Sequence, residues 1–165
     1  MRIRPAESAD LPAVLAINAE GFETYREFAP PEWEPPRFDD IADLAIDEKA
    51  AWLLAEEDGV PIGHAMFIPA TISSVPVDDP KLAHVMQVFV RRSHWGTGVA
   101  SALDAALVEE AVRRGYEHMR LFTPAQQHRA RRFYEREGWR EVDYVAETPL
   151  GFPVVEYRLT CPIPS

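Results

Sequence analysis

The chain has 165 residues, of which 47% are hydrophobic and 27% are charged. This balance is typical of a soluble globular protein and excludes collagen-like and largely disordered chains. We therefore expect a single domain over residues 1–165. The net charge of −10 argues against general nucleic-acid binding, which depends on Lys and Arg side chains near phosphates.

The cysteine content and the lack of long apolar segments indicate where in the cell the protein is found. Cys161 is the one cysteine, so no internal disulfide can form, and the five histidines show no zinc-ligand spacing. We therefore expect no metal and a reducing environment. The N-terminus lacks the apolar core of a signal peptide, and no stretch approaches the roughly 20 apolar residues of a membrane span. The expected location is the cytoplasm, with no membrane partner.

Charge is distributed unevenly. Between Asn18 and Glu48 there are ten acidic residues and two arginines, whereas between Arg113 and Arg140 there are eight arginines and three glutamates. A negative field on the earlier segment would concentrate cations near it. The alternative is that these acids only solvate exposed helices and a loop.

The spacing of apolar residues predicts both helices and strands along the chain. Four prolines in residues 28–36, which lack amide hydrogens, indicate a loop. The apolar run Leu82–Val90 is typical of a strand buried on both faces. In chain order, we expect a strand at Arg2–Arg4, a helix from Ser8 or Asp10 to about Gly21, a short helix at Phe38–Ile46, strands at Trp52–Glu56, Ile62–Ile68 and Leu82–Val90, a helix ended by Gly115, a strand at Met119–Thr123, a helix at Gln127–Glu137, and strands at Trp139–Ala146 and Val154–Leu159.

A glycine-rich turn, WGTGVA at residues 95–100, joins the buried strand to the next helix. Such a turn leaves backbone amides free at the positive end of the helix dipole, which suits a phosphate or diphosphate. Its glycine spacing is not that of a Rossmann fingerprint, and no Gly-Lys-Ser/Thr follows as in a P-loop. The alternative is a tight turn in which glycine serves geometry only.

Two blocks of sequence resemble the coenzyme-A-binding core of the GNAT family of N-acetyltransferases. The first is VFVRRSHWGTGVASALDAALVEEAVRRG, and the second is LFTPAQQHRARRFYEREGWR. The phosphate-loop pattern of the family falls on Trp95, Gly98 and Ala100, and Trp95 departs from its usual Gln or Arg. The helical pattern of the family falls on Gln127, Ala130, Phe133, Tyr134, Gly138 and Trp139, with Gln127 in place of the usual Asn.

This resemblance implies a mixed α/β (α+β) fold, with a twisted and mostly antiparallel sheet of about six to seven strands and about four flanking helices. It implies acetyl-CoA as co-substrate and a small-molecule or peptide amine as acceptor. Direct attack in a ternary complex is expected, because no Ser-His-acid set is visible and Cys161 is far from the motifs. A homodimer through the late strands is common in the family, and the oligomeric state stays open.

The resemblance also assigns roles to residues. Tyr134 would protonate the leaving thiolate, and strand amides near Phe89 and Val90 would bind the acyl oxygen. From spacing alone, Gln127, Ala130 and Tyr134 share one helix face. The alternative for Tyr134 is a core phenol with an exposed tip. The expected cofactor-binding residues are Val88, Phe89, Val90, Trp95, Gly96, Thr97, Gly98, Val99, Ala100, Ser101 and Gln127.

A base for the amine is less evident. The strand Leu82–Val90 offers His84 and Gln87, and His84 is the candidate because the pKa of histidine lies near neutrality. The alternative is a histidine satisfied in the core. Glu23 and Tyr25, which by resemblance border the acceptor pocket, are further candidates.

Two other functions remain open. One is an acyl-CoA-binding domain that has lost catalysis and acts as a sensor or scaffold. The other is an acyltransferase with a different acyl donor or a hydroxyl acceptor. The fold itself does not fix the substrate.

Overall fold

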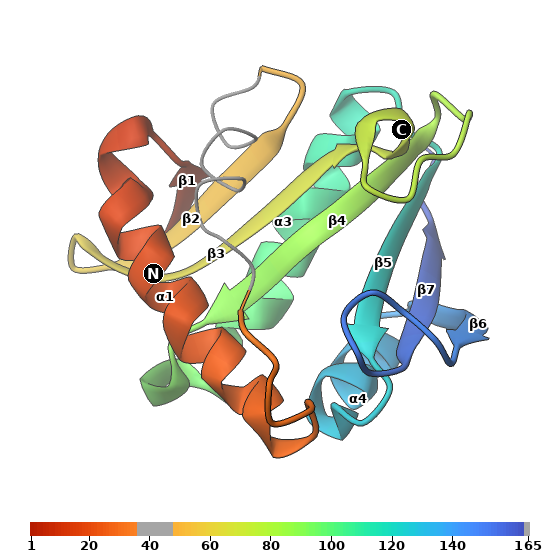
Figure 1. The fold of residues 1–165 in the computed structure, drawn as a ribbon. Helices are drawn as coiled ribbons and strands as arrows, with labels where there is room; N and C mark the ends of the chain where they lie inside the picture. The colour runs from red at the N-terminus through yellow and green to blue at the C-terminus, as the bar shows by residue number, and fades with distance from the viewer. Residues whose placement is uncertain (36–47, 164–165) are drawn as a thin grey trace.

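Seven strands form one mixed sheet in the computed structural model, which describes residues 1–35 and 48–163 (Figure 1). The strands are β1 (Arg2–Pro5), β2 (Ala51–Glu57), β3 (Val60–Pro69), β4 (Leu82–Val90), β5 (His118–Pro124), β6 (Arg140–Val145) and β7 (Val154–Thr160). Their spatial order is β1-β2-β3-β4-β5-β7-β6. Every neighbouring pair is antiparallel except β4 and β5, which are parallel. The predicted mixed and mostly antiparallel fold is confirmed.

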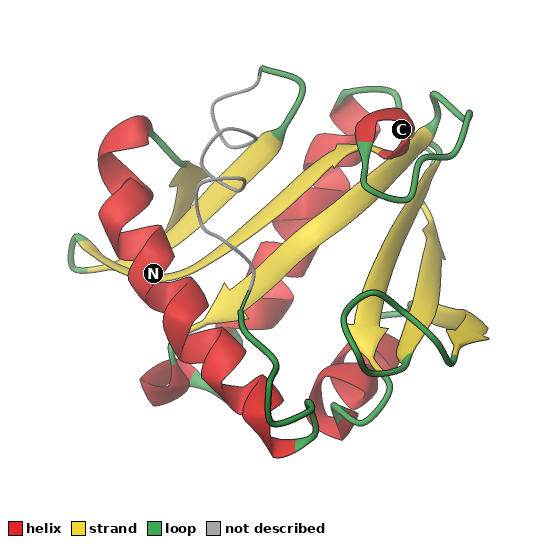
Figure 2. Ribbon diagram, in the orientation of Figure 1, coloured by secondary structure: helices red, strands yellow, loops and turns green. Residues whose placement is uncertain are grey.

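Helices cover both faces of this sheet (Figure 2). α1 (Leu11–Glu23) lies on one face against β3 and β4, and α3 (Val99–Arg113) packs on the other face against β2, β3 and β4. α4 (His128–Arg136) joins the same buried cluster as α3. The helix predicted at Phe38–Ile46 lies outside the described residues. No helix within the described ranges is long and apolar enough to cross a membrane.

The predicted elements are confirmed in order throughout residues 1–35 and 48–163, with small shifts at their ends. The clearest shift is at Gly21, where we expected the first helix to end. α1 instead continues to Glu23 and is followed by a 3-10 turn at Thr24–Glu27. Gly21 serves close packing, because a Cβ there would lie 2.4 Å from the Phe89 ring. The glycine therefore brings α1 against β4 and does not end the helix.

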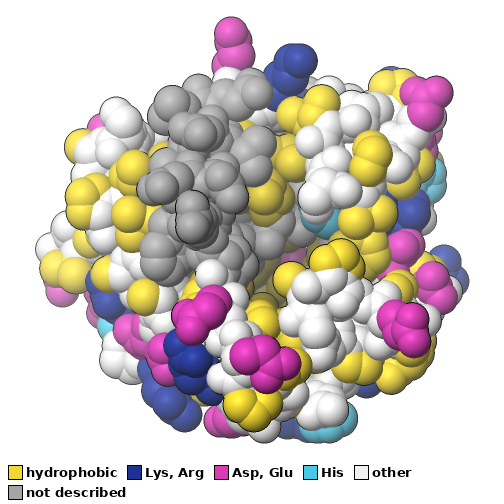
Figure 3. Space-filling view, viewed as in Figure 1, with side chains coloured by type: hydrophobic (Ala, Val, Ile, Leu, Met, Phe, Trp, Pro, Cys, Tyr) yellow, Lys and Arg dark blue, Asp and Glu magenta, His cyan; other side chains and the backbone are white. Residues whose placement is uncertain are grey.

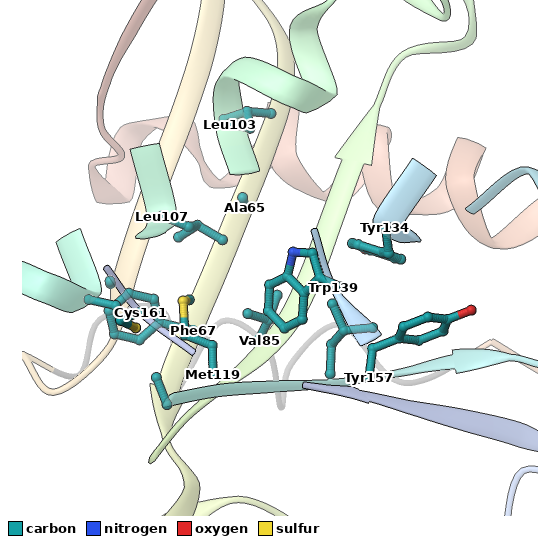
Figure 4. Close-up of a cluster of buried hydrophobic side chains, with 14 of the residues drawn as sticks. Ala65, Phe67, Val85, Leu103, Leu107, Met119, Tyr134, Trp139, Tyr157 and Cys161 are labelled. Atoms are coloured by element: carbon teal, nitrogen blue, oxygen red, sulfur yellow. The ribbon is translucent and has the colours of Figure 1, made fainter. Parts of the chain in front are cut away.

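The main hydrophobic core lies between the sheet and the helices α3 and α4 (Figure 4). Leu103 and Leu107 of α3 pack there with Phe67 and Val85 of the sheet. Aromatic residues fill the side nearest α4, where Tyr134 lies beside Trp139. This core fixes α3 and α4 against the sheet, and with them the two motifs that the sequence singled out.

β4 and β5 run side by side only at their starts. Their pairing covers Leu82–His84 and His118–Arg120, and beyond it the strands separate. The register of β4 against β3 also shifts, which leaves Met86 as an extra residue in β4. The expectation that Leu82–Val90 is buried on both faces is wrong for its second half, which is partly exposed because β5 no longer covers it.

Candidate active site

A cavity of about 790 Å³ opens where β4 and β5 separate. Its walls come from the second half of β4, the glycine-rich turn, the start of α3, the middle of β5, α4 and the end of α1. The separation of the strands leaves one edge of β4 without a strand partner beyond His84. The cavity therefore offers both side chains and free backbone groups to a ligand.

The glycine-rich turn forms one end of this cavity. Gly96 and Gly98 have φ angles of +77° and +88°, a region that glycine adopts without strain. α3 begins at Val99, and none of the amides from Gly96 to Ser101 donates a hydrogen bond to another described residue. These amides lie at the positive end of a 15-residue helix. The turn therefore has the geometry of a phosphate-binding site.

Trp95 has a defined position although it departs from the family pattern. Its indole Nε1 donates a hydrogen bond of 3.0 Å to the carbonyl oxygen of Val90. The guanidinium carbons of Arg92 and Arg129 lie 5.1 Å and 4.8 Å from the centre of its ring. Because Arg129 belongs to α4, this contact joins the turn to α4 beside the cavity.

Most of the predicted cofactor-binding residues line the cavity, namely Val88, Phe89, Val90, Trp95, Gly96, Gly98, Val99, Ala100, Ser101 and Gln127. Thr97 does not line it, and its hydroxyl donates to the carbonyl oxygen of His94 at 2.5 Å. Ser101 donates its hydroxyl to Glu137 at 2.5 Å. Gln127 Nε2 donates to Thr24 Oγ1 at 3.4 Å, which joins the start of α4 to the segment after α1.

The structure also distinguishes among arginines that the sequence could not rank. Arg92, Arg129, Arg132 and Arg136 line the cavity. Arg131 instead donates to the carbonyl oxygen of Ala125 and pairs with Glu141. Guanidinium groups and free backbone amides in one cavity suit the several phosphates of a nucleotide. The only signal in the sequence was a local excess of arginine.

Tyr134 enters the cavity from α4, and it is only 9% exposed. Burial raises the pKa of its hydroxyl well above the usual value, and nearby Asp104 and Tyr25 raise that pKa further. The hydroxyl therefore keeps its proton at neutral pH. It makes no hydrogen bond to any residue that the structure describes, so this proton can be donated to a ligand.

His84 lies beside the cavity but is not part of its wall. Arg120 Nε donates a hydrogen bond of 3.1 Å to His84 Nδ1. Burial and the charge of Arg120 lower the pKa of His84 to about 4, so the ring is neutral at pH 7. Because Nδ1 accepts from Arg120, the single proton of the neutral ring lies on Nε2. In this arrangement His84 presents a hydrogen-bond donor, and its role as a base stays a prediction.

The other candidates for a base differ in position. Tyr25 lines the cavity, and burial raises the pKa of its hydroxyl above the usual value. Glu23 is not in the cavity wall and pairs with Arg26 at 3.1 Å. Gln87 lines the cavity, and its buried Oε1 has no hydrogen-bond partner among the residues that the structure describes. A buried acceptor without a partner is unusual and marks a place for a donor from a ligand or water.

No cluster of three or more potential metal ligands occurs among residues 1–35 and 48–163.

The sequence was also compared with families of known proteins. A model of the acetyltransferase (GNAT) family matches residues 18–139. A search of curated proteins found no match.

Several solved structures have the same fold, and three of them are compared here. yncA from Salmonella typhimurium, which was solved with acetyl-CoA, is 22% identical with a TM-score of 0.79, over 100% of this chain and 96% of that chain. The ribosomal-protein-S18-alanine N-acetyltransferase from Escherichia coli is 20% identical with a TM-score of 0.75, and the match covers 99% of this chain and 96% of that chain. Ard1 from Thermoplasma volcanium is 16% identical with a TM-score of 0.79, and the match covers 99% of this chain and 98% of that chain. The family model covers most of this chain, and the protein therefore belongs to the GNAT family of acetyltransferases.

Proposed function

We propose that this protein is an acetyl-CoA-dependent N-acetyltransferase that acts as one domain over residues 1–165. The observation that carries the proposal is that one cavity is lined both by the glycine-rich turn, with its free amides, and by Tyr134, whose phenol keeps its proton. The amides suit a diphosphate, and the phenol suits a leaving thiolate. Membership of the GNAT family supports the same reaction.

The residues of the cavity can be assigned to parts of the co-substrate. The amides of Gly96–Ser101 would hold its diphosphate, and the side chains of Arg129 and Arg132 would approach its phosphates from α4. The unpaired edge of β4 at Val88–Val90 would bond the amide groups of its extended arm. Ala130 leaves space for that arm, because its side chain is a single methyl group.

Acetyl-CoA supplies a thioester, whose carbonyl carbon forms a C–N bond with the acceptor amine while its C–S bond breaks. Strand amides near Phe89 and Val90 would bond the carbonyl oxygen as negative charge develops on it. Tyr134 would donate its proton to the sulfur, so that the thiol leaves uncharged. The amine loses one proton in the same reaction, which balances the proton that Tyr134 must regain.

The route of the amine proton is the less defined half of the reaction. An amine acceptor is mostly protonated at neutral pH, so it must lose an additional proton to a base or to solvent before attack, besides the one that balances Tyr134. We propose that a water molecule in the acceptor site takes this proton. His84 is the candidate base only when the hydrogen bond from Arg120 to its Nδ1 is broken. In either case activity should rise with pH on the acid side of the profile.

The finer assignments are part of the proposal. The acceptor is a small-molecule or peptide amine, and the protein acts in the cytoplasm without nucleic-acid or membrane partners. The oligomeric state stays open, with a homodimer through the late strands as the candidate. The chain needs no metal for this reaction.

The test is to incubate the purified protein with acetyl-CoA and pools of amines and to measure release of free thiol. We expect release that depends on an amine and exceeds the rate without protein. A protein that binds acetyl-CoA but never releases thiol would instead be the sensor or scaffold. Competition with longer acyl-CoA thioesters separates an acetyltransferase from an enzyme with another donor.

A further inference from the structure

A row of basic side chains crosses the α1 face of the sheet. The strand registers pair His84 with Arg120, Arg120 with Arg158, and Arg158 with Arg140. Directly paired residues point to the same face of a sheet, so these four side chains form one row across β4, β5, β7 and β6. We call His84, Arg120, Arg158 and Arg140 the basic row.

The charges of the basic row are only partly balanced. Glu156 accepts a hydrogen bond of 2.8 Å from Arg158 Nε, which forms the one ion pair of the row with a described residue. Asp143, paired with Glu156 on the same face, forms no ion pair with a described residue. Arginines placed directly opposite one another on a sheet repel and destabilise it. Their arrangement therefore favours an additional anion on this face.

Arg120 is the buried cation of the row, and Glu156, whose charge acts on it, forms no hydrogen bond with it. Only 1% of Arg120 is exposed. Its hydrogen bonds go to neutral acceptors, which are His84 Nδ1 at 3.1 Å, Ser73 Oγ at 3.0 Å and the Val75 carbonyl oxygen at 2.9 Å. Its Nη1 group bonds no residue that the structure describes. A buried cation without a bonded carboxylate is costly, so its retention points to a ligand.

The basic row begins at the inner end of the cavity. His84 and Arg120 are the last pair before β4 and β5 separate. Phe122, two residues further along β5, lines the cavity. Its ring centre lies 5.0 Å from the guanidinium carbon of Arg120 and 5.6 Å from the His84 ring. One aromatic ring therefore separates the co-substrate cavity from the cationic end of the row.

We infer that the basic row binds an anionic group, a carboxylate or a phosphate, carried by the amine acceptor. The inference rests on the proposed acetyltransferase function, because it places the amine in the cavity and the anion over Arg120 and Arg158. In the view of Figure 3 the α1 face is hollowed near its centre. Guanidinium forks match the oxygens of either anion. His84 would donate its Nε2–H to the same group, and in this arrangement a water, not His84, takes the amine proton.

The separation between the cavity and Arg120 limits which acceptors can reach both. Because the Phe122 ring lies between the cavity and Arg120, the amine and the anion must be several bonds apart. A linear ω-amino acid or an aminoalkyl phosphate satisfies this, whereas glycine is too short. This preference is opposite to the one that the acidic segment between Asn18 and Glu48 suggested.

Two described acids of that segment, Glu20 and Glu23, form ion pairs, whereas Glu27, which lines the cavity, forms none with a described residue. Glu20 lies 3.6 Å from Arg91, and Glu23 lies 3.1 Å from Arg26. Each of these carboxylates is balanced by its own arginine. A purely structural role for Arg120, which also holds the segment with Ser73 and Val75, is the competing explanation.

The experiment compares acceptors that differ only in the anion. The ratio of kcat/KM for 4-aminobutyrate to that for butylamine, and for phosphoethanolamine to ethanolamine, reports recognition of the anion. We expect a ratio of about ten or more in the wild type for at least one pair, and the pair that shows it distinguishes carboxylate from phosphate. Arg158→Gln and Arg140→Gln should reduce this ratio, Arg158→Gln by about tenfold.

The control is Arg113→Gln, which removes an exposed arginine of α3 on the opposite face and should leave the ratio unchanged. A structural role for Arg120 predicts no change of the ratio in Arg158→Gln or Arg140→Gln. If neutral amines are acetylated as well as their anionic partners, the inference is wrong and the proposed function stands.

If no amine is acetylated, the proposed function fails and binding alone decides the inference. NMR titration of the wild type with 4-aminobutyrate and phosphoethanolamine then replaces the kinetic assay. Binding that Arg158→Gln weakens supports the basic row as an anion site. Equal binding to both proteins, or none to either, overturns it.

Discussion

The indole Nε1 of Trp139 donates a hydrogen bond of 3.0 Å to the carboxylate of Asp104 behind the ring of Tyr134. The centres of the Tyr134 and Trp139 rings are 6.0 Å apart. Burial raises the pKa of Asp104 to about 6, and its charge in turn raises the pKa of Tyr134. A buried acid outside the cavity wall therefore helps to keep the proposed proton donor protonated.

Tyr134→Phe retains the ring and removes the proton donor. We expect kcat to fall on the order of 100-fold, with the affinity for acetyl-CoA little changed, because only the protonation of sulfur is lost. Steady-state kinetics and calorimetry measure the two quantities. Undiminished turnover would return Tyr134 to the role of a core phenol.

Asp104→Asn should stabilise the protein above pH 6. The folded pKa of about 6 lies above the ordinary value of 3.8, so the folded state binds the proton more tightly. Stability from this group is therefore present below pH 3.8 and is lost as pH rises to 6. Asn retains an acceptor for Trp139 and carries no charge. We expect a gain of up to about 3 kcal/mol at pH 8 that vanishes near pH 4.

Urea unfolding of both proteins at several pH values checks this expectation. A difference between Asp104→Asn and the wild type that does not vary with pH would contradict it. Such a result would mean that the carboxylate is solvated in the folded state.

His64 should have the opposite effect on pH dependence. It is fully buried with its Nε2 2.5 Å from Asn18 Oδ1, and burial lowers its pKa to about 3. The unfolded state binds the proton below the ordinary value of 6.5, so stability is lost as pH falls from 6.5 towards 3. The loss is at most about 1.4 kcal/mol per pH unit.

His64→Gln should flatten this acid loss between pH 6.5 and 4.5, measured as the unfolding free energy relative to the wild type. Asp104→Asn serves as the comparison, because it should change the slope in the opposite sense over an overlapping range. Equal slopes for His64→Gln and the wild type would show that His64 is not held neutral by the fold.

Gly98→Asp should abolish binding of acetyl-CoA without unfolding the protein. A Cβ at Gly98 would meet no atom within 4 Å, so the substitution adds charge without a clash. Gly98→Asn is the matched control, because both residues bear a similar strain at a φ of +88°. We expect the Gly98→Asp protein to bind acetyl-CoA at least about tenfold more weakly than the Gly98→Asn protein, since only the Asp carboxylate repels a diphosphate. Calorimetry that finds equal affinities would remove the phosphate role from this turn.

Local patterns were sufficient for much of the fold and part of the site. The turn at Gly96 and Gly98 follows from glycine's freedom at positive φ, and the amides it exposes follow from the start of α3. Gly21 was misread, because a glycine near a helix end has the same sequence whether it ends the helix or packs closely against Phe89. Local sequence does not contain the neighbour that distinguishes these two uses.

The sequence by itself determined the order of helices and strands, the glycine-rich turn and the place of Tyr134 on its helix, because each depends on residues close together in the chain. Only the tertiary structure decided where β4 and β5 separate, and which side chains meet on the α1 face. Arg120 and His84 are 36 positions apart, and their contact depends on strand register. Register is set by how whole strands bury their apolar faces. The sum of charges along the chain therefore indicated an acidic protein, while strand pairing placed three arginines side by side.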